Sequence, residues 1–197
     1  MLDAMTPTDR LHVITGGPGS GKSTLIAALA EAGMRASPEV GRAIIKEEMA
    51  AGGDALPWAN HRAFAERMIV REIAARDAAL ASGEAVVLDR GAPDVVGFLR
   101  LSGLAVPPHI DAAARACRYN ACVFIAPWWP AIFTTDAERK QTPEEAAATF
   151  AVMVETYQDY GYTLIELPRA TVAKRVAFVL ERIGVRAAAD RLNATKK

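Results

Sequence analysis

The chain has 197 residues, of which 51% are hydrophobic and 23% charged, a composition that suits one compact globular domain and leaves little room for a second. The 23 basic and 23 acidic residues cancel, so no overall charge favours nucleic acid or an anionic membrane. Because the longest apolar stretch, 121–133, contains two prolines and is shorter than the ~20 residues of a membrane span, and the N-terminus lacks a leader pattern, we expect a cytoplasmic protein without nucleic-acid or membrane partners.

Short apolar runs alternate with longer amphipathic segments along the chain. The apolar runs predict strands at 11–15, 34–37, 85–88, 121–126 and 162–167. The amphipathic segments predict helices at 22–32, from Val40 to a stop at Gly52, at 60–82, from Pro93, from a capping box at Thr142 to about Tyr160, and at 172–183. Such alternation predicts an α/β fold with a parallel sheet covered by helices on both faces. Phosphate groups bind at the carboxyl ends of strands in such sheets.

The helix predicted at 60–82 is the longest in the chain. We assign its apolar side chains to a buried stripe and its charged side chains to polar faces. The stripe contains Phe64, Met68, Ile69, Ile73 and Leu80, and the polar faces carry Arg67, Arg71, Glu72 and Arg76.

The segment from Gly16 to Ser23 matches G-x-x-x-x-G-K-[ST] and lies between a predicted strand and a predicted helix. Glycines let successive backbone N–H groups face a phosphate, and the following helix adds its positive N-terminal end. We expect Lys22 to reach the outer phosphates, Ser23 to offer its hydroxyl to magnesium and Thr24 to bond the innermost phosphate. The predicted ligand is ATP with Mg²⁺. Its binding residues are Gly17, Gly19, Ser20, Gly21, Lys22, Ser23 and Thr24.

Acidic residues follow two further strands at the same edge of the predicted sheet. Asp89 ends the strand at 85–88, where the magnesium-associated aspartate of a P-loop protein lies. The same carboxylate could instead cap the turn before Pro93. Glu39 and Arg42 follow the strand at 34–37. Glu39 could likewise be a solvated acid stabilised by a helix N-terminus.

The segment Pro38-Glu39-Val40-x-Arg42 after the second strand, together with Asp89-Arg90 after the third, resembles deoxyribonucleoside kinases. The layout is also similar to kinase-like ATPase domains related to nicotinamide riboside kinases. The resemblance implies a three-layer P-loop fold with a five-stranded parallel sheet in the order 2-3-1-4-5 and a small lid. It further implies that Glu39 accepts the proton of the acceptor hydroxyl and that Arg42 and Arg90 hold the substrate.

Two departures from deoxyribonucleoside kinases leave the acceptor unnamed. The motif after the third strand begins with Asp89 where those kinases carry a glutamate. The long helix offers Glu66 and Arg67 where they carry the glutamine that reads the base. The remaining candidate residues fit a nucleoside, a nucleotide or a hydroxyl-bearing metabolite as the acceptor.

The segment at about 130–142 lies between the fourth predicted strand and the capped helix, where the resemblance to P-loop kinases implies a mobile lid. A closing cation is expected there because phosphoryl transfer depends on positive charge and exclusion of water. We choose Arg139, with Lys140 second, although a solvated charge cluster fits these residues as well. The predicted domain covers 11–184, with a flexible N-terminus at 1–10 and a tail at 185–197.

The predicted function is transfer of the γ-phosphoryl group of ATP to a hydroxyl or phosphate on a small molecule. The catalytic residues would be Lys22, Glu39, Asp89 and Arg139. The alternative is a nucleotide-dependent switch ATPase that binds a protein or lipid partner and needs no acceptor base. GTPases are unlike this chain because no asparagine is followed by lysine, as a guanine-reading motif requires. The oligomeric state stays open between monomer and homodimer.

Overall fold

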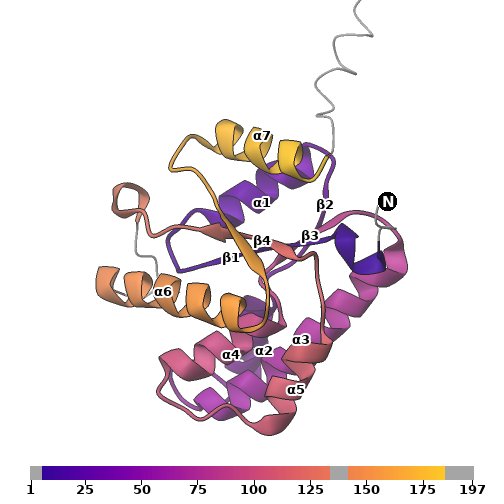
Figure 1. Ribbon diagram of the computed structural model, residues 1–197. Helices are drawn as coiled ribbons and strands as arrows, with labels where there is room; N and C mark the ends of the chain where they lie inside the picture. The colour runs from indigo at the N-terminus through magenta and orange to yellow at the C-terminus, as the bar shows by residue number, and fades with distance from the viewer. Residues whose placement is uncertain (1–5, 134–141, 185–197) are drawn as a thin grey trace, which may run out of the picture.

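The computed structural model describes residues 6–133 and 142–184 (Figure 1). Its centre is a sheet of five parallel strands in the order β2-β3-β1-β4-β5, which confirms the predicted fold. The strands are β1 Leu11–Gly16, β2 Arg35–Ser37, β3 Val86–Asp89, β4 Cys122–Ala126 and β5 Thr163–Glu166. Each lies within one residue of the run that predicted it.

Helices cover both faces of this sheet, so the molecule has three layers. The helices are α1 Lys22–Glu31, α2 Val40–Ala51, α3 His61–Ser82, α4 Ala92–Leu101, α5 Pro108–Ala116, α6 Pro143–Asp159 and α7 Val172–Arg182. Figure 1 shows α1 and α7 side by side on one face and the other helices on the opposite face. Short 3₁₀ turns, Pro7–Arg10 and Pro130–Ile132, complete the described elements.

Local chemistry explains where the helices begin and end. The side chain of Asn60 accepts from the Ala63 amide at the start of α3. Thr142 and Glu145 form the predicted capping box of α6. Gly52 adopts the left-handed conformation after α2, which glycine reaches without the steric cost that a Cβ brings.

The strands distribute their side chains between two hydrophobic clusters. Val13 and Leu88 point into the larger cluster, beneath α3, α4, α5 and α6. Their neighbours Ile14 and Val87 point into the smaller cluster, beneath α1 and α7. This alternation follows from the two-residue period of a strand. The central strands β1, β3 and β4 are buried on both faces, which explains why they read as continuous apolar runs.

Helix α5 and the two 3₁₀ turns were not predicted from the sequence. Helix α5 is only 9 residues long, buries only Ile110 and Ala114, and is otherwise rich in alanine and polar residues. The turn Pro7–Arg10 lies within the segment that we expected to be flexible.

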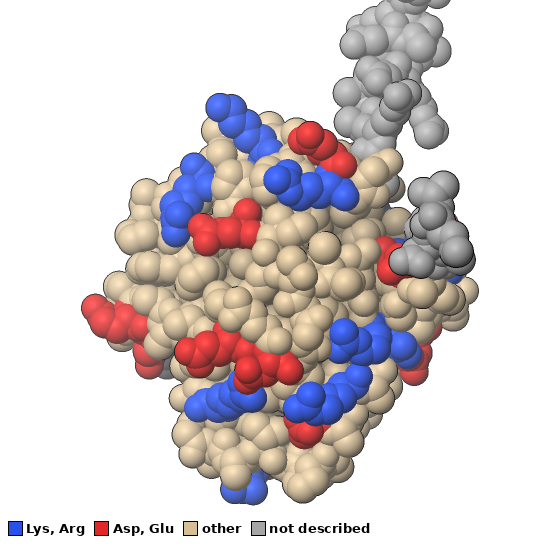
Figure 2. All heavy atoms as spheres, viewed as in Figure 1, with Lys and Arg blue, Asp and Glu red and all other residues tan. Residues whose placement is uncertain are grey.

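Charged side chains are mixed over the surface. On the face in Figure 2, lysine and arginine are interspersed with aspartate and glutamate, and no extended area of one sign is visible. Among the residues that the structure describes, no helix has the length and apolarity to cross a bilayer.

Candidate functional site

The carboxyl ends of β1, β2 and β3 lie at one edge of the sheet. In the strand register, Ile14 is level with Asp89, and Ser37 is level with Leu88. The glycine loop after β1, Glu39 after β2 and Asp89 at the end of β3 therefore meet at this edge. The structure thus brings together residues that are far apart in the sequence.

The glycine loop depends on backbone positions that exclude a side chain. Gly21 has a φ of 77° and leads into α1, whose first residue is Lys22. At Gly16, a Cβ would lie 2.5 Å from the carbonyl oxygen of Ala126 on the neighbouring strand. Ser23 and Thr24 lie exposed in the first turn of α1. The N–H groups of this turn have no intrahelical acceptor, which leaves them available to an anion.

The ammonium group of Lys22 lies across the mouth of the loop. Its Nζ donates to the carbonyl oxygens of Gly16 at 2.8 Å and Gly17 at 2.7 Å. The side chain is buried, and this desolvation, followed by the nearby positive charge of Arg90, lowers the pKa of Lys22 to about 7. An added anion at the loop would favour the charged ammonium.

Glu39 is flanked by two guanidinium groups. Arg42 Nε donates to Glu39 Oε2 at 2.8 Å, and Arg90 Nε lies 3.8 Å from Glu39 Oε1. Burial alone would raise the pKa of Glu39, but the positive charges of Arg90, Lys22 and Arg42 hold it below its usual value. The carboxylate is therefore ionised at neutral pH and able to accept a proton or a hydrogen bond.

Asp94, which the sequence analysis did not select, fixes Arg90. Arg90 has a φ of 80°, which is strained for a residue with a side chain, and its Nη1 donates to Asp94 Oδ1 at 3.0 Å. Asp94 also accepts from the hydroxyls of Thr15 at 2.7 Å and Tyr157 at 2.6 Å, and from the Gly91 amide at 3.0 Å. With these four donors, Asp94 holds Arg90 in position. The sequence signal for this role is that Asp94 directly follows Pro93 in the first turn of α4.

Asp89 keeps one carboxylate oxygen without a partner. Its Oδ1 is buried and accepts no hydrogen bond from the residues that the structure describes. Burial raises the pKa of Asp89, against the lowering effect of Arg90 and Lys22. Magnesium prefers oxygen ligands and commonly uses one or two protein groups together with phosphates and water. The donor set of Asp89 and the Ser23 hydroxyl fits that pattern, and no denser metal-binding cluster occurs among the described residues.

Glu72 was wrongly predicted to lie on a polar face of α3. Only 1% of the residue is exposed, and its Oε1 has no partner within the described part of the chain. Burial, followed by the nearby charge of Asp94, raises the pKa of Glu72 to about 8. Glu72 follows Phe64 and Met68 at four-residue intervals, so helical spacing alone places it on their buried face.

Replacing Glu72 with glutamine should stabilise the protein more strongly as the pH rises. Because the pKa of Glu72 is higher in the folded chain, its contribution to stability is fully present below pH 4.5 and is lost as the pH rises through about 8. The stability gain of Glu72→Gln over wild type should therefore grow by up to about 1.4 kcal/mol per pH unit in this window. It should level off above pH 8. Urea unfolding between pH 5 and 9 measures it.

Wild type and Glu72→Gln both contain Lys22, so the titration of Lys22 cancels in the difference between their free energies of unfolding. Glu181→Gln, at an exposed site on α7, is the matched control. Its difference from wild type in the free energy of unfolding should stay the same across this pH range. A pH-independent difference for Glu72→Gln would contradict the assignment of the raised pKa to Glu72.

On the lid side, Phe133 covers the glycine loop. A Cβ on Gly19 would lie 2.5 Å from the Phe133 ring, whose centroid is 5.0 Å from that of Trp128 in an edge-to-face pair. The Trp128 carbonyl accepts from Arg169, which follows β5, at 3.2 Å. Arg139 lies outside the described residues.

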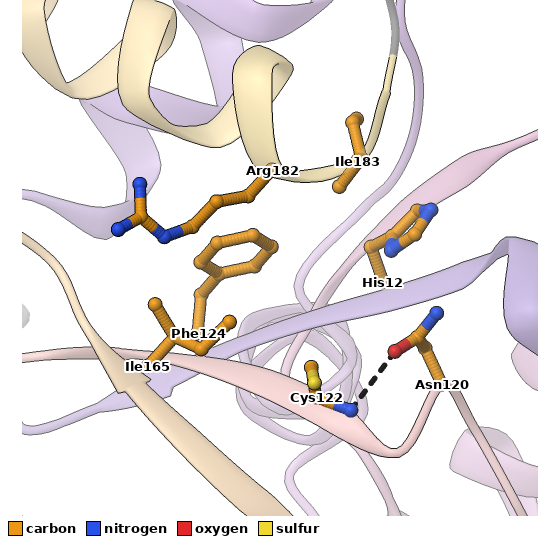
Figure 3. A pocket seen from close by; sticks show the side chains of 7 residues that line it. All are labelled: His12, Asn120, Cys122, Phe124, Ile165, Arg182 and Ile183. Carbon is orange, nitrogen blue, oxygen red and sulfur yellow. Dashed lines mark hydrogen bonds between the residues drawn. The ribbon is translucent and has the colours of Figure 1, made fainter.

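A separate pocket of about 170 Å³ lies near the amino ends of the strands (Figure 3). Its lining residues come from β1, β4, β5, the end of α7 and Asn120 before β4. They are His12, Asn120, Cys122, Phe124, Ile165, Arg182 and Ile183. Asn120 Oδ1 accepts from the Cys122 amide at 2.8 Å. This pocket contains none of the predicted site residues.

Comparisons with known proteins identify the same fold. A family model described as an AAA domain matches residues 11–175. Among solved structures, NadR in complex with NR superposes with a TM-score of 0.69 at 16% identity, over 91% of this chain and 53% of that one. The chain thus spans about half the length of NadR. No curated protein matches the sequence.

Two kinases of similar length also share the fold. Deoxyadenosine kinase from M. mycoides, with the products dCMP and dCDP, gives a TM-score of 0.60 at 15% identity, over 88% of this chain and 98% of that one. Shikimate kinase from Acinetobacter baumannii, in complex with shikimate, gives 0.53 at 19% identity, over 88% and 91%. At these identities the likeness concerns the fold alone.

Proposed function

The chain belongs to the family described as an AAA domain and is a P-loop NTPase of the nucleoside-kinase-like group, and from this premise we propose that it is a small-molecule kinase. It transfers the γ-phosphoryl group of ATP to a hydroxyl or phosphate acceptor. The observation that carries this proposal is the meeting of Lys22, Glu39 and Arg90 at one edge of the sheet, with Glu39 ionised between two arginines.

The glycine loop supplies the donor end of the reaction. Backbone N–H groups of the loop and of the first turn of α1 bind the phosphates, with Thr24 at the innermost one. Lys22 exchanges its bonds to the Gly16 and Gly17 carbonyls for the outer phosphates. That exchange replaces neutral acceptors with anionic ones and so strengthens each hydrogen bond.

Asp89 and Ser23 would hold Mg²⁺. The unpartnered, buried Oδ1 of Asp89 supports this role because a buried carboxylate oxygen without a donor is costly unless a ligand uses it. When bound, the ion neutralises charge that develops on the β- and γ-phosphates.

Glu39 and the two arginines supply the acceptor end. The acceptor oxygen attacks the γ-phosphorus, the bond to the β-γ bridging oxygen breaks, and ADP leaves. The proton of the acceptor hydroxyl passes to Glu39, which can take it because its carboxylate is ionised at neutral pH. Arg42 and Arg90 hold the acceptor, and Arg139 closes over the transferring group from the lid.

The pairing of Glu39 with Arg42 and Arg90 favours a kinase over a switch ATPase. A switch needs the phosphate loop and a moving segment, but no carboxylate and arginines at the neighbouring strand end. The acceptor groups lie beside the hydrophobic core, where Phe64 packs edge-to-face with Phe98 at 5.3 Å.

A thermal-shift screen tests the proposal. Nucleosides, nucleotides and common hydroxyl metabolites are added to the protein with Mg²⁺ and a non-hydrolysable ATP analogue. We expect the analogue to raise the melting temperature and one acceptor class to raise it further, because ligands stabilise the state that they bind. Stabilisation by the analogue without any acceptor would favour the switch alternative.

A further inference from the structure

Arg175, on α7, contacts the glycine loop from the face of the sheet that α1 and α7 cover. Helix α2, which Glu39 precedes, lies on the opposite face. Only 3% of the residue is exposed. Its Nη1 donates to the carbonyl oxygen of Ser20 at 3.0 Å, and a Cβ on Gly21 would lie 2.9 Å from the same nitrogen. Figure 1 shows α7 packed beside α1, the helix that the loop enters. The guanidinium group therefore adjoins the end of the loop that leads into α1.

The charge of Arg175 has no counterion in the described part of the chain. Its Nε and Nη2 are buried and have no hydrogen-bond partner there, and no ion pair involves the side chain. Burial lowers the pKa of Arg175, and no nearby carboxylate opposes that effect. A buried, unpaired cation is strongly unfavourable unless an anion joins it. The fold thus keeps a costly group beside a loop whose form suits phosphate.

The position of Arg175 along the glycine loop indicates which phosphates of a bound nucleotide it can contact. Lys22 Nζ lies at the Gly16 and Gly17 end of the loop, on the side of Asp89. Arg175 lies at the Ser20 and Gly21 end, next to the first turn of α1. We propose that Arg175 binds the inner phosphates, those that ADP and ATP share, through its free Nε and Nη2. This inference rests on the proposed function, because it takes ATP as the ligand of the loop.

Calorimetric titration of the full chain with ADP or the non-hydrolysable ATP analogue, each with Mg²⁺, tests this role. Arg175→Met should weaken both ligands by the same factor, about tenfold or more, since a hydrogen bond to a charged group contributes about 1.5–3 kcal/mol. Lys174→Met, the exposed neighbour on α7, is the charge-matched control and should bind both ligands as wild type does. The melting temperature of Arg175→Met without ligand should equal or exceed that of wild type, because an unpaired buried charge is removed.

Equal ADP affinity in Arg175→Met and wild type would overturn the inference, and so would a loss confined to the ATP analogue. If Arg175→Met does not fold, Arg175→Lys replaces it. One ammonium cannot reproduce a forked guanidinium, so a severalfold loss is still expected and unchanged affinity contradicts the role. Failure of the wild type to bind either ligand would instead refute the proposed function, which separates the two claims.

Discussion

Glu39→Gln should lower the rate of phosphoryl transfer by roughly 10²–10⁴-fold, the range for loss of a general base. Glutamine keeps the shape and can still accept a bond from Arg42, but it cannot take the proton of the acceptor hydroxyl. The affinity for ATP should stay within about threefold of wild type, because Glu39 follows β2 and lies outside the glycine loop. Single-turnover transfer of labelled phosphate, together with titration of the ATP analogue, measures both quantities.

Glu31→Gln, at the exposed end of α1, is the matched control for this substitution. It removes the same charge without touching the strand ends and should leave transfer and ATP affinity unchanged. Unchanged turnover in Glu39→Gln would remove Glu39 from the mechanism. An equal loss of ATP affinity and turnover would show that its carboxylate supports the donor site and not the acceptor.

Lys22→Ala should weaken ATP binding by roughly 10–100-fold and lower turnover by at least about 10²-fold. Lys22 is the cation of the glycine loop, and charge-assisted bonds to phosphate contribute about 1.5–3 kcal/mol. Loss of a preorganised donor to the transition state has a comparable or larger effect on the rate. Titration with the ATP analogue and single-turnover kinetics measure the two effects.

Lys46→Ala, at an exposed position on α2, removes the same charge and should change neither measurement. Normal ATP affinity together with normal activity in Lys22→Ala would refute the role of the glycine loop. Because a switch ATPase also needs this lysine, Lys22→Ala tests nucleotide binding only. The Glu39→Gln substitution distinguishes a kinase from a switch ATPase.

The fold was readable from the sequence because local signals agreed with the final structure. The three central strands β1, β3 and β4 are apolar runs buried on both faces. The helices carry caps such as Asn60 and Thr142 and end at glycines such as Gly52. Helix α5 is short and has no side-chain cap, and the alanines on its surface are the same residue type as the alanine that it buries. Its place depends on packing against α3 and α4, which no local pattern records.

The glycine loop could be selected as a candidate donor site for a different reason. It is one continuous segment whose residue types follow from its geometry, so Gly16 to Ser23 could be proposed together. Asp89, Glu39 and Arg90 were selected as candidates through their places after strands, and the register places them at one edge of the sheet. The closing role of Arg139 remains a prediction.

The residues that were missed depend on partners distant in the sequence. Asp94 gains its role from Thr15 and Tyr157, which lie on β1 and α6. Arg175 reaches the Ser20 carbonyl, 155 positions away in the sequence, because α7 packs beside α1. Glu72 differs, because its spacing from Phe64 already indicated the buried face; its charge led to the wrong assignment.

The most direct test of the central claim follows the γ-phosphoryl group itself. The protein is incubated with Mg²⁺, ATP labelled at the γ-phosphorus and a pool of small hydroxyl and phosphate metabolites, and the products are separated by mass. We predict that label appears in one small organic product, at a rate that falls by roughly 10²–10⁴-fold in Glu39→Gln. Label released only as inorganic phosphate, at the same rate in wild type and Glu39→Gln, would contradict the assignment as a kinase.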